Sequence, residues 1–147
     1  MKTVRQLLDR KGHNVWSIDP DATVLDALEM LAKKDIGALV VMDGQRLVGL
    51  VAERHYARNV VLKGRTSAAT PVREIMETCL VTTIPYATVE QCMVLMTETR
   101  VHHLPVLDDG RVIGIVSIGD LVEIIISEQK STIKHLEHYI HGNGNAL

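Results

Sequence analysis

Apolar and polar residues follow one order twice along this chain. Moving the segment from His13 to Ala57 forward by 65 positions places it on Thr78 to Val122 without a gap. Most apolar residues then fall on apolar residues. Identities kept under this shift include the pairs Pro20/Pro85, Thr23/Thr88 and Gly49/Gly114. Self-similarity of this period predicts two copies of one structural unit.

Each copy is predicted to form the elements β-α-β-β-α. A short extended segment ends at a proline, whose ring disfavours helix for the residue before it. The first helix begins with a threonine followed three residues later by a side-chain acceptor, and its apolar residues recur at i, i+4 and i+7. Two β-rich runs joined by turn residues predict a hairpin, and a second helix closes the unit. The segments are 15–18, 24–31, 38–42, 46–51 and 54–62, then 80–84, 89–96, 104–107, 111–116 and 120–126.

A matched lead-in precedes each copy, Val4 to Leu8 and Val72 to Met76, related by a shift of 68 positions. Because each copy has one sheet face to bury, its twin is the nearest partner. We therefore predict an α+β fold in which two repeats pack sheet to sheet with pseudo-twofold symmetry, leaving two equivalent clefts. The divisions are a first repeat (1–62), a polar linker (63–71), a second repeat (72–127) and a C-terminal helical tail (128–147).

Composition narrows the function classes. The 16 Lys and Arg against 18 Asp and Glu leave a formal charge of −2, which gives no long-range attraction to nucleic acid or anionic lipid. No apolar run approaches the ~18 residues of a membrane span, and the first residues carry charges where a signal peptide is apolar. A cytoplasmic protein is predicted, with neither nucleic acid nor membrane as partner. Cys92 pairs with Ala27 under the shift, which favours a small core residue over a reactive one.

The element order and the run HLPVLDDGRVIGIVSIGDL, residues 103–121, resemble the tandem CBS-domain module, named after cystathionine β-synthase and also called a Bateman module. The resemblance covers residues 1–127. Its most specific part is GIVSIGD, Gly114 to Asp120, which matches the family pattern of glycine, apolar residues, Ser or Thr, two variable residues and Asp. It implies a freestanding regulatory sensor that binds an adenosine-containing nucleotide between the copies. AMP is expected first, with ADP, ATP, NAD and S-adenosylmethionine as the other ligands.

Ser117 and Asp120 carry the chemistry of the second copy. An ionised Asp120 has two oxygens spaced for vicinal donors, so it suits both hydroxyls of a ribose. Ser117 lies at the strand-to-helix junction, where its hydroxyl, free backbone N–H groups and the helix dipole favour phosphate. The same Ser-x-x-Asp spacing is also an ordinary helix N-capping pattern, and one residue pair is able to serve both purposes.

The first copy departs from this pattern. Ala52 and His55 stand where the second copy has Ser117 and Asp120, so the hydroxyl and the carboxylate are both missing. His55 is kept as a candidate contact to phosphate or ribose, with simple accommodation in the cleft as the alternative. We expect asymmetric occupancy, with the Ser117/Asp120 site the stronger.

The resemblance implies further contacts from segments before the first strand and before the hairpin of the second copy. Arg54 is a candidate source of positive charge for a phosphate. Trp16, the only tryptophan, is expected to pack against the lead-in, with stacking on a base in the weaker cleft as the alternative. The implied contacts are Met76, Thr78, Leu80, Val81 and Thr82 around adenine, and Val101, His102 and His103 near the sugar or phosphates.

Histidines raise the question of a metal. His102 and His103 are adjacent on a strand, so they point to opposite faces, and no carboxylate or cysteine lies at ligand spacing. His135, His138 and His141 recur every third residue, a spacing that drifts round a helix. No metal is therefore predicted.

Two copies of the chain are expected to associate. The resemblance implies homodimers formed through paired helices, and the apolar segments 56–62 and 121–126 suit this. Ile133, Leu136 and Ile140 add a stripe at i, i+3 and i+7 that suits docking on a partner subunit.

Two other function classes follow from the residues. A small hydrolase would use His55, Cys79 or His102, but the sequence has no GxSxG elbow, no P-loop and no nucleophile with a base and orienting acid. We therefore predict that the protein is not an enzyme. A structural interaction module without ligand binding is the other alternative, and it fits the degenerate first copy.

Overall fold

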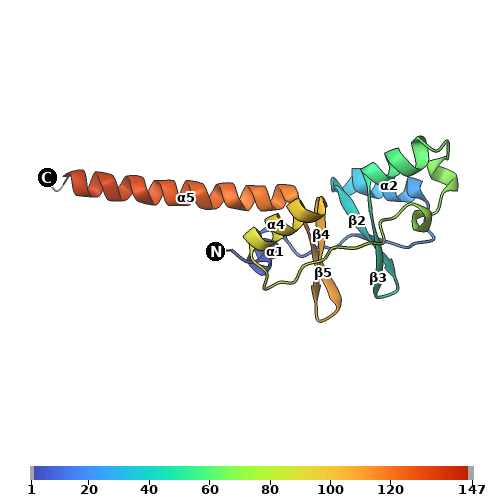
Figure 1. Cartoon of the computed structure of the whole chain (residues 1–147), viewed down its shortest axis with the longest axis horizontal. Coiled ribbons are helices and arrows are strands. Elements are labelled where there is room, and N and C mark those ends of the chain that lie inside the picture. The colour runs from blue at the N-terminus through green and yellow to red at the C-terminus, as the bar shows by residue number, and fades with distance from the viewer. Residues whose placement is uncertain (1, 146–147) are drawn as a thin grey trace.

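The computed structural model describes residues 2–145 as two lobes with one long projecting helix (Figure 1). The first half contains α1 (Val4–Lys11), β1 (Ser17–Ile18), α2 (Val24–Lys34), β2 (Ala38–Asp43), β3 (Arg46–Ala52), α3 (Glu53–Tyr56) and the π-helical η1 (Ala57–Val61). The second half contains the 3₁₀ turns η2 (Ser67–Ala69) and η3 (Val72–Glu74), then α4 (Val89–Thr99), β4 (His103–Asp108), β5 (Arg111–Ser117) and α5 (Ile118–Asn145). The predicted α+β class is confirmed.

Local sequence explains where the paired helices begin. Thr23 and Thr88 each accept a hydrogen bond from the backbone N–H three residues on, and the side chains of Asp26 and Gln91 accept from the threonine N–H in return. Both capping boxes were predicted, and each satisfies two N–H groups that the helix leaves unpaired. Each helix then buries its apolar stripe on the sheet of its own lobe.

The lead-ins cross to the opposite lobe. Figure 1 shows α1 beside α4 and the start of α5, although α1 precedes the first copy in sequence. The N–H of Val4 donates to the Ala87 carbonyl at 2.9 Å, and at the equivalent place the N–H of Val72 donates to the Ala22 carbonyl at 2.8 Å. Each lobe is therefore completed by the lead-in of the other copy. The lobes for this reason do not coincide with the contiguous ranges 1–62 and 72–127 that the sequence predicts.

The two sheets pack against each other at the centre. Sheet β1-β2-β3 and sheet β4-β5 contribute apolar residues to one shared cluster, so the predicted sheet-to-sheet contact is present. The cluster is built on Ala38, Val40, Leu50 and Ala52, with Val15, Met42, Leu47, Leu80, Val112 and Ile115 packed on it. Small residues in the first sheet let the second approach closely.

The predicted strand at 80–84 is reduced to one parallel bridge between Thr83 and Val106. Its equivalent in the first copy, β1, pairs over two residues, Ser17 with Val40 and Ile18 with Val41. Pro105 stands where the first copy has Val40, and proline has no N–H to donate to the ladder. The missing N–H of Pro105 therefore explains why the second copy has a single bridge where the first copy has a two-residue strand.

Close packing of the crossed lead-ins predicts that alanine destabilises the protein to different extents at two equivalent glycines. A Cβ at Gly114 would lie 2.7 Å from Leu8 Cδ2, and a Cβ at Gly49 would lie 2.5 Å from Met76 Sδ. Leu8 is branched and 1% exposed, whereas Met76 is flexible and only half-buried. We expect Gly114→Ala to lower the free energy of unfolding by about 1–3 kcal/mol, and Gly49→Ala by less. Urea denaturation measures both, and equal losses would contradict the asymmetry.

Candidate functional site

The larger of the two clefts between the lobes contains Ser117 and Asp120. It has a volume of about 330 Å³. The first copy provides most of its wall, from the end of α1, the segment after it and the turn between α2 and β2, while the second copy provides the start of β4, part of β5 and the start of α5. We call it the Asp120 cleft, lined by Lys11, Gly12, Asn14, Trp16, Asp35, Ile36, Gly37, Ala38, His103, Ile115, Ser117 and Asp120.

Asp120 caps α5 and binds a lysine at the same time. Its Oδ2 accepts from the Ser117 N–H at 2.9 Å, and the Asp120 N–H donates to Ser117 Oγ at 3.0 Å. Lys11 Nζ lies 2.6 Å from the same Oδ2 and also donates to the Ile115 carbonyl at 2.7 Å. The N-capping interpretation of Ser-x-x-Asp is thus confirmed, and a cation from α1 is added to it.

Hydrogen bonding decides the charge of Asp120. Half-burial by itself raises the pKa of the carboxyl group, but hydrogen bonds from Lys11 and Ser117 outweigh it and hold the pKa below its ordinary value. Asp120 is therefore an ionised acceptor at neutral pH. Its Oδ2 already has two donors, so a further ligand must use Oδ1 or displace Lys11.

The N–H groups at this junction are less available than the sequence suggests. The Ser117 N–H binds Asp120, the Asp120 N–H binds Ser117, and the Ile118 N–H donates to the His102 carbonyl at 2.9 Å. The expectation that free N–H groups here hold phosphate is therefore wrong for three of them. The Lys11 ammonium is the cation that lines this cleft.

The second cleft is nearly closed. Its volume is about 20 Å³, roughly the space of one water molecule. It combines β3 and the start of α3 from the first copy with the segments 77–81 and 101–105 from the second. We call it the Arg54 cleft, lined by Leu50, Ala52, Arg54, Glu77, Cys79, Leu80, Val81, Val101, His102, His103 and Pro105.

Side-chain size explains the difference in volume. Gly37 and Ala38 line the Asp120 cleft, and His102 and His103 stand at the equivalent positions in the Arg54 cleft. Two imidazoles fill space that a hydrogen and a methyl group leave open. His103 lines both clefts and lies so close to Gly37 that a Cβ there would approach its Nε2 to 2.9 Å.

The predicted contact residues therefore divide between the clefts. Leu80, Val81, Val101, His102 and Arg54 line the Arg54 cleft, not the cleft of Ser117 and Asp120. The prediction that these residues share one site with Ser117 and Asp120 was wrong. In each cleft, one copy supplies the strand-to-helix junction and the opposite copy supplies most of the remaining wall.

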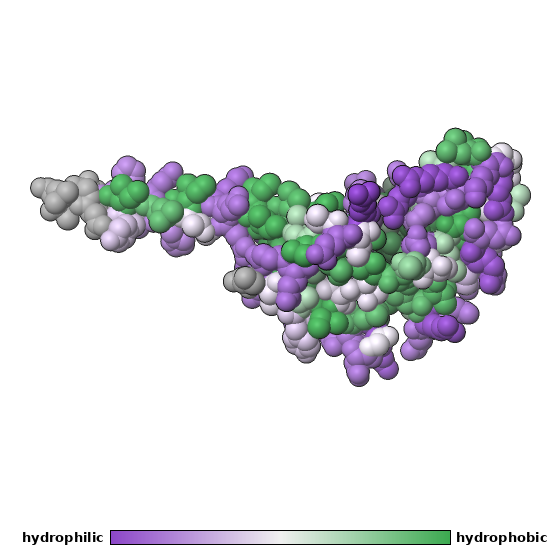
Figure 2. All heavy atoms as spheres, viewed as in Figure 1, coloured by the Kyte–Doolittle hydropathy of each residue, from purple (hydrophilic) through white to green (hydrophobic). Residues whose placement is uncertain are grey.

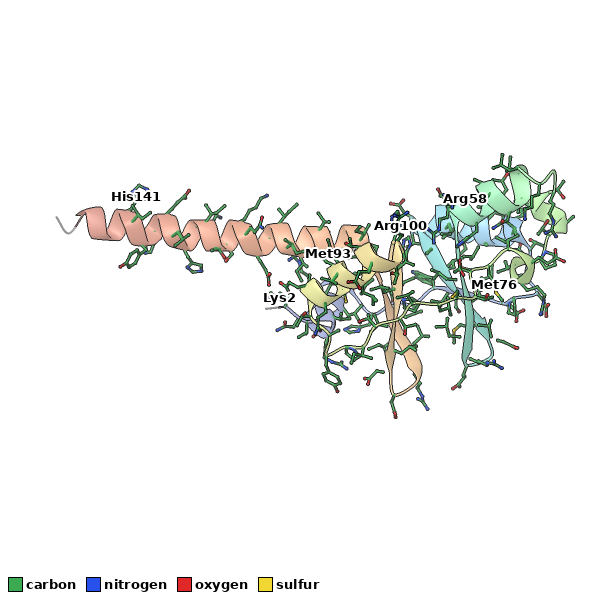
Figure 3. The ribbon with its side chains drawn as sticks, in the orientation of Figure 1. Lys2, Arg58, Met76, Met93, Arg100 and His141 are labelled. Carbon is green, nitrogen blue, oxygen red and sulfur yellow. The ribbon has the colours of Figure 1, made fainter. Side chains whose placement is uncertain are left out.

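Three further predicted contacts line neither cleft. Met76 packs on Gly49 in the core of the first lobe, where Figure 3 labels it. Thr78 is exposed and Thr82 half-buried, and neither belongs to the lining of either cleft. Their expected adenine contacts do not fit this geometry.

His55 is a buried helix cap. It is 7% exposed, its Nδ1 accepts from the Ala52 N–H at 2.9 Å, and it is absent from the lining of the Arg54 cleft. Burial, assisted by the charge of Arg54, lowers its pKa. The neutral ring thus replaces the capping carboxylate of Asp120, and accommodation describes it better than ligand contact.

Sequence reasoning missed Lys11, and for Trp16 it expected packing against the lead-in, with the weaker cleft as the alternative. Trp16 lines the Asp120 cleft rather than the weaker one, is 38% exposed, and has the Lys34 ammonium 4.0 Å from its ring centre. No sequence signal pointed to them, because the crossing of the lead-ins, which brings the end of α1 and the segment after it to the cleft of Asp120, is a feature of the tertiary structure.

Comparison with known proteins identifies the family. The model of the CBS domain matches the chain twice, at residues 4–61 and 72–127. The chain belongs to the CBS-domain family. A CBS domain-containing protein of Arabidopsis thaliana, CBSX3, named as mitochondrial, is 37% identical over 150 residues, covering 95% of this chain and 72% of the relative.

Solved CBS-domain structures share the fold. The structure of CBS domain protein NE2398 is 48% identical, with a TM-score of 0.82, and covers 85% of this chain and 98% of that one. The CBS domain pair of protein MJ0100, crystallised with 5′-methylthioadenosine and S-adenosyl-L-methionine, has a TM-score of 0.78 at 22% identity, with coverage of 87% and 98%. The second likeness shows a common fold.

Residues 2–145 contain neither a candidate membrane span nor a candidate metal site. No helix in this part of the chain combines the length and apolar character needed to cross a bilayer. The same residues contain no group of three or more His, Cys, Asp or Glu side chains placed to hold a metal ion.

The lowered pKa values of His55 and His103 predict a loss of stability in mild acid. Burial, with the neighbouring charge of His102, lowers the pKa of His103 to about 4. The unfolded chain, with a pKa near 6.5, takes up the proton first as the pH falls. Stability is therefore complete above about pH 6.5 and decreases toward pH 4, by about 1–2 kcal/mol at pH 5 from His103 alone.

Urea denaturation between pH 5 and pH 7 measures this effect. We expect His103→Gln to have a shallower pH dependence than the unsubstituted protein. His135→Gln, on the exposed tail, removes one histidine without touching either cleft and serves as the control. Identical pH dependence in His103→Gln and the unsubstituted protein would contradict the argument.

Proposed function

We propose that this CBS pair is a regulatory, non-enzymatic sensor that binds an adenosine nucleotide, AMP first, in the Asp120 cleft. One observation carries the proposal: a carboxylate, an ammonium group and an indole line a single cavity of about 330 Å³. That volume lies at the lower end of the ~300–1,000 Å³ range of small-molecule sites. The adenosine compounds bound by the MJ0100 pair support the choice of ligand class.

Asp120 is assigned to the ribose. A vicinal diol donates two hydrogen bonds, which match the two oxygens of one carboxylate. Because Lys11 occupies Oδ2, the diol must displace the ammonium group as it binds. The freed ammonium then pairs with the 5′-phosphate. A phosphorylated ligand thus breaks the Lys11–Asp120 ion pair and forms a new one between Lys11 and its own phosphate.

Trp16 is assigned to the base. Its indole lines the cleft and is partly exposed. The Lys34 ammonium also lies over this ring, but Lys34 is not among the residues that line the cleft. An adenine stacked on the indole buries two flat apolar faces. The closed Arg54 cleft supports binding at one cleft of the pair, although Arg54, Leu80, Val81, Val101 and His102 remain candidates there for a ligand that opens it.

Ligand specificity follows from the same groups. The diol is common to AMP, ADP, ATP and NAD, so Asp120 does not distinguish them, and Lys11 offers one ammonium group for the phosphates. AMP, which carries one phosphate group, suits this one ammonium group best. An interaction module without ligand binding is the second candidate, favoured by the ion pair that already fills the site of Asp120.

The proposal also covers the association of two copies of the chain and the location of the protein in the cell. Two copies form a homodimer through apolar side chains left exposed on the helices, among them Val61 at 53% and Val122 at 42%. The proposed location is the cytoplasm, and cell fractionation tests it against the mitochondrial naming of the Arabidopsis relative.

Recognition of the diol is tested by calorimetry with AMP and 2′-deoxy-AMP. We expect the unsubstituted protein to prefer AMP by about ten- to a hundredfold, the worth of a hydrogen bond to a charged group. Asp120→Asn should weaken AMP binding and abolish the preference. Asp109→Asn, at the hairpin turn, removes one charge away from both clefts and is the matched control. Equal affinities of Asp120→Asn and unsubstituted protein for AMP would refute the assignment.

Lys11→Met separates phosphate from ribose recognition. Loss of the ammonium group removes the competitor for Asp120 and the partner of the phosphate together. We expect AMP to bind more weakly and adenosine at least as tightly as in the unsubstituted protein. Emission of the single tryptophan reports both titrations, because Trp16 lies in the cleft. An equal loss for AMP and adenosine would show that Lys11 does not contact the phosphate.

A further inference from the structure

Helix α5 carries an apolar stripe that the fold leaves uncovered. Within the second lobe α5 buries Leu121 and Ile124, which are 0% and 3% exposed. A different side of the helix stays open from Val122 to Ile140, and Figure 2 shows apolar side chains continuing along the projecting part. The exposed fractions on this side are 42% for Val122, 47% for Ile126, 54% for Ile133, 57% for Leu136 and 65% for Ile140.

The stripe has the period of a coiled coil rather than of a single helix lying on a globular body. Ile126, Ile133 and Ile140 recur every seven residues, and Val122, Gln129 and Leu136 recur every seven between them. This makes six consecutive a and d layers, about 27 Å at 1.5 Å per residue. Isoleucine fills the three a positions, and β-branched residues at a favour two parallel strands where leucine is at d, as at Leu136. A second helix with the same period is the surface that such a stripe fits.

We propose that two copies of this chain associate through their α5 helices as a parallel, in-register, two-stranded coiled coil over Val122 to Ile140. The occupant of the stripe is thus the same segment of a second molecule. The contact begins on the body of the protein, at Val122 and Ile126, and continues without interruption into the projecting helix. It deepens the proposed homodimer by naming its surface, and it does not depend on nucleotide binding.

Charge favours the parallel orientation. Glu123, Lys130 and Glu137 occupy the e positions beside the stripe. In a fully overlapped antiparallel pair, Glu123 would face Glu137 of the partner subunit and Lys130 would face Lys130 of the partner subunit. Like charges in such positions are destabilising. In the parallel pair Lys130 faces Ile125 of the partner subunit and Glu137 faces Thr132 of the partner subunit, so no like charges meet.

Gln129 favours the in-register arrangement. It is the polar member of the d positions, and an amide placed in an apolar contact is costly unless it finds a hydrogen-bond partner. In the parallel, in-register pair it lies in one layer with Gln129 of the partner subunit, and two amides satisfy each other. In the antiparallel pair it would face Ile133 of the partner subunit. We infer that this polar layer specifies register, as a lone Asn at an a position does in other coiled coils.

Sedimentation velocity of the full chain tests the association. We expect the unsubstituted protein to sediment as a dimer and the variant Ile133→Asp/Leu136→Asp to weaken dimerisation by at least about a hundredfold, since a carboxylate in each layer must be desolvated. Both residues are exposed in the single chain, so the lobes should keep their melting temperature. Ser131→Asp/His138→Asp, on the side of the tail away from the stripe, adds the same charge as a control and should remain dimeric.

Disulfide trapping tests the orientation. Gln129→Cys, in a Cys79→Ser background that removes the exposed native thiol, should form a covalent dimer under mild oxidation. A monomeric unsubstituted protein, or a dimer that survives Ile133→Asp/Leu136→Asp, would overturn the proposed contact. A dimer in which Gln129→Cys fails to cross-link would overturn the parallel register. We expect the Ile133→Asp/Leu136→Asp variant still to bind AMP. A failure of AMP binding would therefore count against the proposed function and not against the coiled coil.

Discussion

The structure depends on a reciprocal exchange of backbone hydrogen bonds between the two halves of the chain. The segment before α1 and the first turn of α1 bond to the backbone around Pro85 and Val89, and the segment around η3 bonds in the same way around Pro20 and Val24. Each half supplies three such bonds to the other, with distances between 2.8 and 3.0 Å. These bonds bury no charge and need no particular side chains. They fix which segments meet at each cleft.

Both clefts are composite for this reason. The carboxylate of Asp120 comes from the second copy, whereas the ammonium of Lys11 and the indole of Trp16 come from the first. Divergence in both copies then acts on one cleft: Ala52 and His55 remove the hydroxyl and carboxylate from the Arg54 cleft, and His102 and His103 fill it. The duplicated scaffold therefore holds one open site and one closed site.

Sequence periodicity predicted the element order, the capping boxes, the sheet contact and the unequal status of the two sites. Those features depend on neighbours within one copy or on a comparison of equivalent positions. The crossing of the lead-ins was not predictable, because α1 and η3 are as compatible with their own copy as with the other. Missing the crossing assigned Leu80, Val81 and His102 to the wrong cleft and left Lys11 out. The effect of Pro105 on the second copy's strand was readable in principle, since a proline cannot donate to a ladder.

The central claim is that an adenosine nucleotide binds at the composite cleft of Lys11, Trp16 and Asp120. A crystal structure of the protein grown with AMP tests it most directly. We expect density for adenine on Trp16, for the ribose hydroxyls at the Asp120 carboxylate, and for the Lys11 ammonium moved from Asp120 to the phosphate. Nucleotide density in the Arg54 cleft alone, or AMP bound with the Lys11–Asp120 pair still intact, would contradict it.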